Sequence, residues 1–333
     1  MQTRITQPGP VLDERGRPHP GWSDRSVLTY RRGDIKAPFH RIKEWDYYQI
    51  SDENMCLELT FGHASYAGQV GAMLFNFRTG ERYRAPDKLL ALPFGRLHLP
   101  ESAQADSDLI YDKGGLYMRF RVEGGRRQLT CRGDGFEAEI HLTPTTDKNL
   151  VINVPFDESP TAFYYNQKIN CLRAEGAVRY PGGRHIFGPN AWGILDWGRG
   201  CWPFHNEWYW SNGAGEIEGQ ALGFNLGMGF GNTSAATENI LFYGGESHKL
   251  GAVRFELDQG NYLKPWRLTD DDGRLELTLY PSFDRTTRTK LLWVDNGCHQ
   301  VFGEFTGYVV LDDGRRLDVS RLYSFAEHAV NNW

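Results

Sequence analysis

The chain of 333 residues has few features of a disulfide-bonded, membrane-spanning or zinc-binding protein. Its five cysteines are widely spaced, form no CxxC pair and are odd in number, which argues against a disulfide framework and a zinc site. No apolar run approaches the roughly 20 residues that cross a bilayer. The first residues, Met1–Trp22, lack an apolar signal segment. We therefore expect reduced thiols, no membrane span and a cytoplasmic protein.

Basic charge is also scarce, with 37 Lys and Arg residues against 42 Asp and Glu residues. Nucleic acid is not an expected partner, because phosphate binding needs a concentrated basic surface. The histidines show no HxH or HExxH spacing, and the glycine-rich GMGFGN segment lacks the dinucleotide fingerprint, so we expect no metal and no cofactor. The acidic segment Thr269–Arg274 predicts an exposed hairpin tip in preference to a calcium site, because Asp-Gly is a common hairpin turn.

Aromatic residues and glycine are abundant, at 14% and 38 residues respectively. Aromatic side chains favour pleated, half-buried surfaces, and glycine favours turns and close strand crossings. Short runs such as Arg41–Ser51 alternate with period two and are separated by glycine-containing turns. No long apolar stripe has helical spacing; residues 85–95 suggest a short helix or a loop, and residues 322–333 hint at a helical turn. The pattern predicts an all-β fold of antiparallel sheets closed as barrels or sandwiches.

The length fits two domains or one large β domain. Residues 1–25 are rich in proline, glycine and charge, and predict an extended N-terminal arm. The segment Pro155–Phe163 interrupts the strand pattern with two prolines and two acids, which suggests a crossing between halves. We therefore expect an N-terminal β domain over residues 26–158 and a C-terminal β domain over residues 159–333.

The segment Gly193–Gly213 combines four of the ten tryptophans with several ionisable side chains. On two strands, Ile194 and Asp196 would share a face opposite Leu195 and Trp197. On the second strand, Trp208, Trp210 and Asn212 would lie opposite Glu207. Two indoles at i and i+2 form a continuous wall, which can fill a barrel, stack on sugars or line a cavity for a flat or polyene ligand.

Two interpretations of this segment remain open. The tryptophans can plug a barrel while Asp196 and Arg199 form an ion pair at its corner. Alternatively, the same groups line a dry pocket, in which a carboxylic acid beside indole is shifted toward its neutral form and becomes a proton donor. The candidate catalytic residues are Asp196, Arg199, Glu207 and His205. The candidate substrate-binding residues are Trp208, Trp210, Asn212, Trp197, Tyr164, Asn239 and Trp45.

Several segments resemble a bacterial family of uncharacterised proteins, the domain-of-unknown-function family 2804 (DUF2804). The similar segments span nearly the whole chain: VLDERGRPHPGW, KEWDYY, NCLRAEG, GPNAWGILDWGRG, WYWSNG, ATENILFY, VFGEFTGY and FAEHAVNNW. In architecture the chain is similar to two-domain lipocalin-like proteins, which include carotenoid 1,2-hydratases, tocopherol cyclases and fungal Diels–Alder cyclases. That resemblance implies two lipocalin-like β domains packed together, with few short helices and with ligands in an aromatic cavity in or between the domains. It transfers no catalytic pattern residue by residue.

Three functions fit these observations. The first is a cofactor-independent lyase or isomerase, of hydratase or cyclase type, in which Asp196 or Glu207 protonates an apolar isoprenoid, polyene or quinone-like molecule. Arg199 would be its electrostatic partner and His205 a second proton carrier. The second function is a non-catalytic carrier of a small hydrophobic molecule, and the third is carbohydrate processing or binding on a β-sandwich. The oligomeric state is not predicted.

Overall fold

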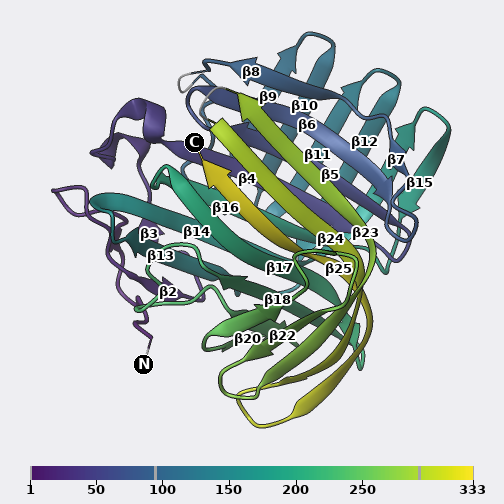
Figure 1. Cartoon of the computed structure of the whole chain (residues 1–333). Coiled ribbons are helices and arrows are strands. Elements are labelled where there is room, and N and C mark those ends of the chain that lie inside the picture. The colour runs from purple at the N-terminus through teal and green to yellow at the C-terminus, as the bar shows by residue number, and fades with distance from the viewer. Residues whose placement is uncertain (1, 94–95, 292–293, 333) are drawn as a thin grey trace.

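The computed structural model describes residues 2–93, 96–291 and 294–332. Two large curled antiparallel sheets pack against each other and contain most of these residues (Figure 1). The helices of the described ranges are two short 3₁₀ turns, η1 (Arg32–Asp34) and η2 (Phe39–Arg41). No helix in those ranges is long and apolar enough to cross a membrane. The prediction of an all-β fold with two packed antiparallel sheets and few short helices is confirmed.

The first sheet is organised around the long strand β14 (Ser159–Tyr180). Its first half pairs with β13 and β16, and its second half pairs with β12 and β15. The main path of the sheet runs through β7 (Arg82–Tyr83), β6 (Ala67–Asn76), β5 (Met55–His63), β4 (Lys43–Ser51), β16 (Trp192–Cys201), β14, β12 (Phe136–Pro144), β11 (Arg126–Gly133), β10 (Leu116–Glu123) and β9 (Ser107–Lys113). The strands off this path are β2 (Gly21–Ser23), β8 (Asp87–Ala91), β13 (Leu150–Phe156) and β15 (Gly183–Phe187).

The second sheet is formed by the C-terminal part of the chain, and its longest strands are at its centre. The final strand β25 (Arg316–Asn332) pairs with β17 on one side and with β24 on the other. The order across the sheet is β20 (Glu246–Lys249), β19 (Ile240–Tyr243), β18 (Gln220–Met228), β17 (His205–Ile217), β25, β24 (Val294–Val310), β23 (Leu275–Leu291), β22 (Trp266–Asp270) and β21 (Val253–Glu256).

The chain passes from the first sheet to the second at residues 202–204, between β16 and β17. The Pro155–Phe163 segment is not this crossing; it contains the turn of the β13–β14 hairpin, where Phe156 pairs with Ser159. Proline and acidic residues favour a tight turn inside a sheet as readily as a crossing. The division into domains at residues 158 and 159 stays a prediction, and the change of sheet lies C-terminal to it.

In the N-terminal arm predicted for residues 1–25, the described residues 2–25 include short strands that pair with other segments. β2 pairs with β13, and β1 (Gly9–Pro10) pairs in parallel with β3 (Leu28–Thr29). The amide of Asn153 donates hydrogen bonds to the carbonyl oxygens of Val11 at 2.8 Å and His19 at 3.1 Å. The arm is therefore held by backbone pairing and by side-chain contacts, among them those of Asn153 and the ion pair between Lys148 and Asp24.

Two segments that suggested helical or irregular structure are strands. Residues 87–91 form β8, which pairs with β6, and residues 94–95 lie outside the described part of the chain. Residues 322–332 belong to β25, and residue 333 is not described. Because β25 has strand neighbours on both sides, pairing across the sheet outweighs the weak helical pattern.

Each sheet has a hydrophobic core on one face, and the opposite faces of the two sheets meet. At this contact, the Phe75 ring of the first sheet lies 4.8 Å from the Phe302 ring of the second, measured between centroids. Phe77 and Phe325 extend the same cluster. This packing holds the sheets together beside a region that side chains do not fill.

Candidate active site

A cavity of about 560 Å³ lies between the two sheets. The first sheet lines it with side chains from β4, β5, β6, β14 and β16, and the second with side chains from β17, β23, β24 and β25. Among the lining groups is an acid cluster, which we define as Lys168, Asp196, Glu238 and Glu327. The cavity therefore joins apolar surface to buried ionisable groups that come from distant parts of the sequence.

Much of the cavity wall is aromatic. The ring centroids of Trp45 and Trp202 lie 5.3 Å apart, and those of Trp208 and Phe230 lie 5.1 Å apart. The ring planes are steeply inclined in both pairs. Trp45 packs directly on β16 at Gly198, where a Cβ atom would lie 2.3 Å from the indole. Glycine at this strand position permits that close approach. The aromatic wall consists of Trp45, Tyr164, Trp202, Trp208, Trp210 and Phe230.

Lys168 and Asp196 form a buried ion pair in the wall. They are direct partners across β14 and β16, and this register brings Lys168 Nζ to 3.0 Å from Asp196 Oδ1. Asn166 donates a second hydrogen bond to the same oxygen at 2.6 Å. The ammonium also lies 4.0 Å from the centroid of the Trp210 ring. Each charge is thus compensated inside the protein, as a buried pair requires.

Glu238 adds a second carboxyl beside this pair. Its Oε2 atom lies 3.8 Å from Lys168 Nζ and accepts no hydrogen bond from the described residues. Gly227 on β18 leaves space for the side chain, since a Cβ atom there would lie 2.2 Å from Glu238 Oε1. Burial raises the pKa of Glu238, because a poorly polar environment disfavours the carboxylate.

Glu327, on β25, is the third carboxyl of the cavity. Trp208 Nε1 donates a hydrogen bond to its Oε1 atom at 2.8 Å, and the Cys298 thiol lies 3.9 Å from its Oε2 atom. Burial raises the pKa of Glu327 to about 7, although Trp208 and Lys168 favour its ionised form. A neutral carboxylic acid beside an indole is therefore present near neutral pH, and such an acid can donate a proton.

A second ion pair joins the two sheets at the cavity. Arg285 Nη1 on β23 lies 2.6 Å from Glu58 Oε2 on β5. The Tyr47 hydroxyl donates to Glu58 Oε1 at 2.8 Å, and Arg285 also donates to Gln300. Both charged side chains are mostly buried. This bridge fixes the separation of the sheets and compensates the charge of Glu58.

The structure brings together five of the predicted site residues. Asp196 and Trp210 lie in the cavity wall, next to Lys168. Trp208 lies on the same face of β17 as Trp210, as the alternation predicts. The predicted residues that line the cavity are Trp45, Tyr164, Asp196, Trp208 and Trp210. Their roles in binding or catalysis stay predictions.

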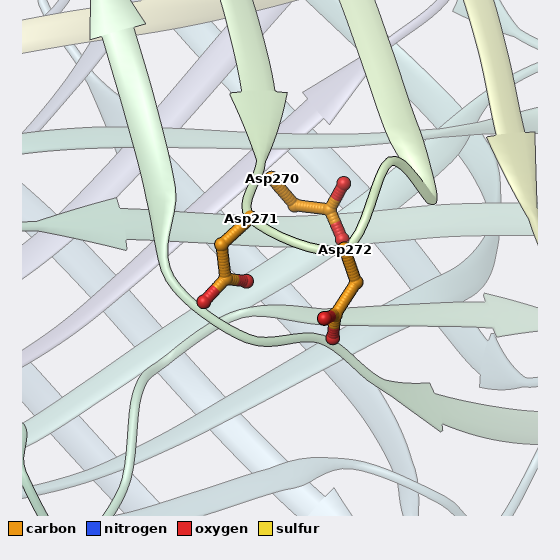
Figure 2. A group of neighbouring side chains, drawn as sticks. All are labelled: Asp270, Asp271 and Asp272. Carbon is orange, nitrogen blue, oxygen red and sulfur yellow. The ribbon is translucent and has the colours of Figure 1, made fainter.

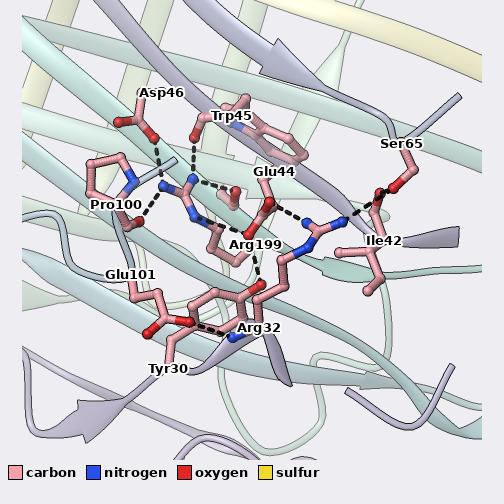
Figure 3. Close-up of polar contacts among 11 residues, drawn as sticks. Tyr30, Arg32, Ile42, Glu44, Trp45, Asp46, Ser65, Pro100, Glu101 and Arg199 are labelled. Carbon is pink, nitrogen blue, oxygen red and sulfur yellow. Dashed lines mark hydrogen bonds and ion pairs between the residues drawn. The ribbon is translucent and has the colours of Figure 1, made fainter. Parts of the chain in front are cut away.

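Arg199 and Trp197 lie on the opposite face of β16 from Asp196, in the core of the first sheet. The Arg199 side chain is fully buried, and its guanidinium lies 2.7 Å from Asp46 Oδ1. Figure 3 shows this contact and the hydrogen bonds to backbone carbonyl oxygens. The expected ion pair between Asp196 and Arg199 is wrong. Residues three apart on a strand face opposite ways, so Asp196 pairs with Lys168 instead.

Glu207 and His205 lie outside the cavity, at a separate surface pocket. The Glu207 side chain is 46% exposed, and its Oε1 atom lies 2.8 Å from His328 Nε2. His205 is exposed, with Nδ1 lying 2.9 Å from Asn332 Oδ1. Of the aromatic wall, Phe230 also lines this surface pocket, whereas the other rings of the wall and the acid cluster line the cavity between the sheets.

Asn212 and Asn239 are buried and bond to other parts of the protein instead of lining the cavity. Asn170 Nδ2 donates to Asn212 Oδ1 at 2.6 Å, and the backbone amide of Gly227 donates to Asn239 Oδ1 at 2.7 Å. These bonds satisfy buried polar groups. Both side chains therefore stabilise the second sheet and its contact with β14.

Sequence reasoning did not select several ionisable groups of the cavity. Glu327 was not predicted as a site residue because its segment hinted at a helical turn. Lys168 was not predicted because its pairing with Asp196 depends on strand register. One signal was available, since Glu238 and Glu327 both lie in segments of the family resemblance, ATENILFY and FAEHAVNNW. Among the lining residues that were not predicted are Glu58, Lys168, Glu238, Arg285 and Glu327.

Three adjacent carboxylates, Asp270, Asp271 and Asp272, meet at the turn between β22 and β23 (Figure 2). Asp270 Oδ1 accepts hydrogen bonds from the backbone amides of Arg274 at 2.7 Å and Leu275 at 2.9 Å. The acidic run therefore forms the hairpin tip that the sequence predicted, with Asp270 closing the turn.

The fold and the cavity define a class of all-β proteins in which two antiparallel sheets enclose an aromatic, acid-lined hollow. The chain belongs to the family described as "Domain of unknown function (DUF2804)", whose profile matches residues 2–333. The family predicted from the sequence is thus confirmed. No curated protein matches the chain at a significant level.

Solved structures with a similar fold are distant in sequence. Kievitone hydratase from Nectria haematococca matches with a TM-score of 0.55 at 12% identity, covering 87% of this chain and 88% of that chain. CghA with Sch210972 matches with a TM-score of 0.53 at 11% identity, covering 87% and 88%. A Nitrosomonas europaea protein matches with a TM-score of 0.52 at 15% identity, covering 86% and 92%. The lipocalin-like architecture is therefore confirmed, and the similarity concerns the fold.

Proposed function

We propose that the protein is a lyase or isomerase of hydratase or cyclase type that acts on an apolar small molecule, such as an isoprenoid, polyene or quinone-like compound. The proton that starts the reaction comes from Glu327. A single observation carries this proposal: a buried carboxyl with a pKa of about 7, bonded to Trp208, faces an aromatic cavity. The fold similarity to kievitone hydratase and CghA supports it.

The cavity suits a small apolar molecule. Its volume of about 560 Å³ lies within the roughly 300–1,000 Å³ that small-molecule sites span. Aromatic side chains cover much of its wall, and the buried charged groups include the acid cluster and the Glu58–Arg285 bridge. An apolar substrate would be held by the rings, with its reactive double bond near the acid cluster.

The reaction begins when the neutral Glu327 carboxyl gives its proton to one carbon of a double bond. The O–H bond breaks, the π electrons form a new C–H bond, and the neighbouring carbon becomes cationic. Addition of water and return of a proton to the Glu327 carboxylate complete a hydration. Attack by a second double bond, followed by proton loss to the carboxylate, completes a cyclisation. Both routes regenerate the acid.

Asp196, the other predicted acid of the cavity, has a different role in this scheme. It accepts hydrogen bonds from Lys168 and Asn166, and this arrangement suits a carboxylate that acts as a counter-ion. We assign it to charge compensation and positioning in the wall. Arg199, Glu207 and His205 have no part in the proposed chemistry, because they lie away from the cavity lining.

Deuterium incorporation from D₂O into a panel of isoprenoid alkenes and carotenoids tests the role of Glu327. Glu327→Gln keeps a hydrogen-bond acceptor for Trp208 but removes the transferable proton. We expect turnover, followed by mass spectrometry, to fall at least about 100-fold, while ligand affinity measured by tryptophan fluorescence stays unchanged. Glu207→Gln, a carboxyl outside the cavity, should leave both measurements at the wild-type level.

Turnover of Glu327→Gln at the wild-type rate would contradict the proposal. Tight binding of the panel without deuterium incorporation by the wild-type protein would favour the carrier instead. Binding of oligosaccharides by a protein that ignores the panel would favour the carbohydrate function.

A further inference from the structure

We infer that the cavity contains a cation subsite, bounded by the aromatic wall and by the carboxyls of Glu238 and Glu327. It takes the positive centre that the substrate acquires on protonation, and it binds apolar ammonium compounds in the same place. This inference deepens the proposed function by naming the charge that the cavity recognises. Three features of the structure carry it: an excess of carboxyls, an unsatisfied oxygen and indole rings around both.

The acid cluster holds three carboxyls and one ammonium group. Lys168 and Asp196 compensate each other at 3.0 Å, and the bridge between Glu58 and Arg285 is likewise balanced at 2.6 Å. Glu238 reaches Lys168 only at 3.8 Å. Glu327 accepts from Trp208, a neutral donor, and contacts the Cys298 thiol, which is also neutral. Lys168 and Lys249 act on Glu238, and Lys168 and Arg285 act on Glu327. Within the described part of the chain, however, neither carboxyl has a cation at hydrogen-bond distance.

Glu238 also has an open acceptor position. Its Oε2 atom is buried, accepts no hydrogen bond within the described part of the chain, and belongs to a residue that is only 8% exposed. A buried acceptor left without a donor is costly, because it has given up its hydrogen bonds to water. A donor on a bound ligand would satisfy it. A neutral hydroxyl would supply the hydrogen bond alone, whereas a protonated amine would supply the hydrogen bond and the missing charge.

The aromatic wall suits a cation in this position. Lys168 already places its ammonium 4.0 Å from the centroid of the Trp210 ring, so the wall accommodates one cation over an indole face. Trp208 lines the same cavity and donates its N–H to Glu327. Indole faces attract cations more strongly when water is excluded. An indole ring and a carboxyl that can both attract a cation thus line the same cavity.

Two ligands of nearly equal shape test the subsite. Protonated N,N-dimethylbenzylamine and neutral isobutylbenzene differ chiefly in the nitrogen and its charge. Titrations near neutral pH, followed by the fluorescence of the lining tryptophans, should show the amine binding at least about tenfold more tightly, as expected for a desolvated cation on aromatic faces.

Variants of the two carboxyls assign the preference to the acid cluster. Glu238→Gln and Glu327→Gln should each lower the amine affinity about fivefold or more, because each removes a carboxyl whose ionised form the bound cation favours. Isobutylbenzene affinity should stay within about twofold, since the shape and apolar surface of the cavity are retained. Glu207→Gln is the matched control and should change neither affinity.

Equal affinities for the two ligands, or an amine affinity that neither cavity variant alters, would overturn the inference. Preserved binding of isobutylbenzene by the variants shows that their cavity is intact. Failure here is distinguishable from failure of the proposed function: Glu327-dependent deuterium incorporation without amine preference removes only the cation subsite. Amine preference without any turnover removes only the catalytic role.

Discussion

Asp196 and Glu327 line the same cavity but have different hydrogen-bond partners. Asp196 accepts from an ammonium group at 3.0 Å and from an amide at 2.6 Å. Glu327 accepts from an indole N–H, and Lys168 and Arg285 act on it from beyond ion-pair distance. Opposite charge favours a carboxylate, and burial favours the neutral acid. Which carboxyl suits proton donation therefore depends on the groups around it, and not on whether it belongs to Asp or Glu.

The raised pKa of Glu327 predicts a pH-dependent stability. Because the folded protein holds this proton more tightly than the unfolded chain, the stabilisation is fully present below pH 4.5, the ordinary carboxyl value, and is lost as the pH rises through about 7. Glu327→Gln removes this loss. The variant should gain about 3 kcal/mol relative to the wild type between pH 4.5 and pH 8. Urea unfolding at both pH values measures it.

Glu175→Gln serves as the control for that experiment, because Glu175 is exposed. It should show no change of this size across the same range. A stability difference between Glu327→Gln and the wild type that stays constant with pH would show that the carboxyl is not held neutral by burial.

At the scale of elements, strand alternation on β16 and β17 explains which side chains reach the cavity. Asp196 on β16, and Trp208 and Trp210 on β17, share faces that meet between the sheets. Trp45 of β4 reaches the same space because Gly198 of β16 offers no side chain. The close approach of one strand's indole to another strand's backbone thus shapes the wall.

Gly198→Ala tests this packing. The new Cβ atom would lie 2.3 Å from the Trp45 indole, a rigid group that cannot move away cheaply. We expect a loss of about 1–3 kcal/mol in unfolding free energy, as in other overpacked cores, together with weaker binding of isobutylbenzene. Gly188→Ala, with no atom within 4 Å of its Cβ, should change neither. Unchanged stability in Gly198→Ala would mean that the two strands separate easily.

For the whole molecule, the contact between the sheets creates both the cavity and its rigidity. The Phe75–Phe302 contact at 4.8 Å and the Glu58–Arg285 bridge at 2.6 Å both cross from one sheet to the other. A small change in the angle between the sheets would alter both contacts. We therefore expect the bridge to contribute to global stability and not only to the local site.

Arg285→Met tests the bridge, since it leaves the Glu58 carboxyl buried without its cation. Breaking one partner of a buried pair costs about 3–5 kcal/mol, and urea unfolding should show a loss of this order. The double variant Glu58→Gln/Arg285→Met should recover part of the loss. Glu256→Gln breaks an exposed pair with Arg267, at side-chain exposures of 56% and 47%, and should cost less than about 1 kcal/mol. If Arg285→Met and Glu256→Gln lost equal amounts of unfolding free energy, the result would contradict a buried bridge.

Much of the fold was predictable because it follows from local rules. Period-two alternation and glycine-rich turns identify an all-β chain, and they place Asp196 and Trp197 on opposite faces of one strand. The same rule places Arg199 on the opposite face from Asp196, which excludes an ion pair between them. The helical hint at the C-terminus was misleading, because a short pattern cannot show that β25 has a strand on each side.

The amino-acid sequence by itself determined the strand-forming pattern, the turns and the face on which each side chain of β16 and β17 lies, because these depend on neighbours along the chain. Only the tertiary structure decided that Lys168 stands opposite Asp196 and that Glu238 and Glu327, distant in sequence, share one cavity. Strand register and the packing of two curled sheets set those distances. The burial that keeps Glu327 protonated near neutral pH exists only once the sheets have met.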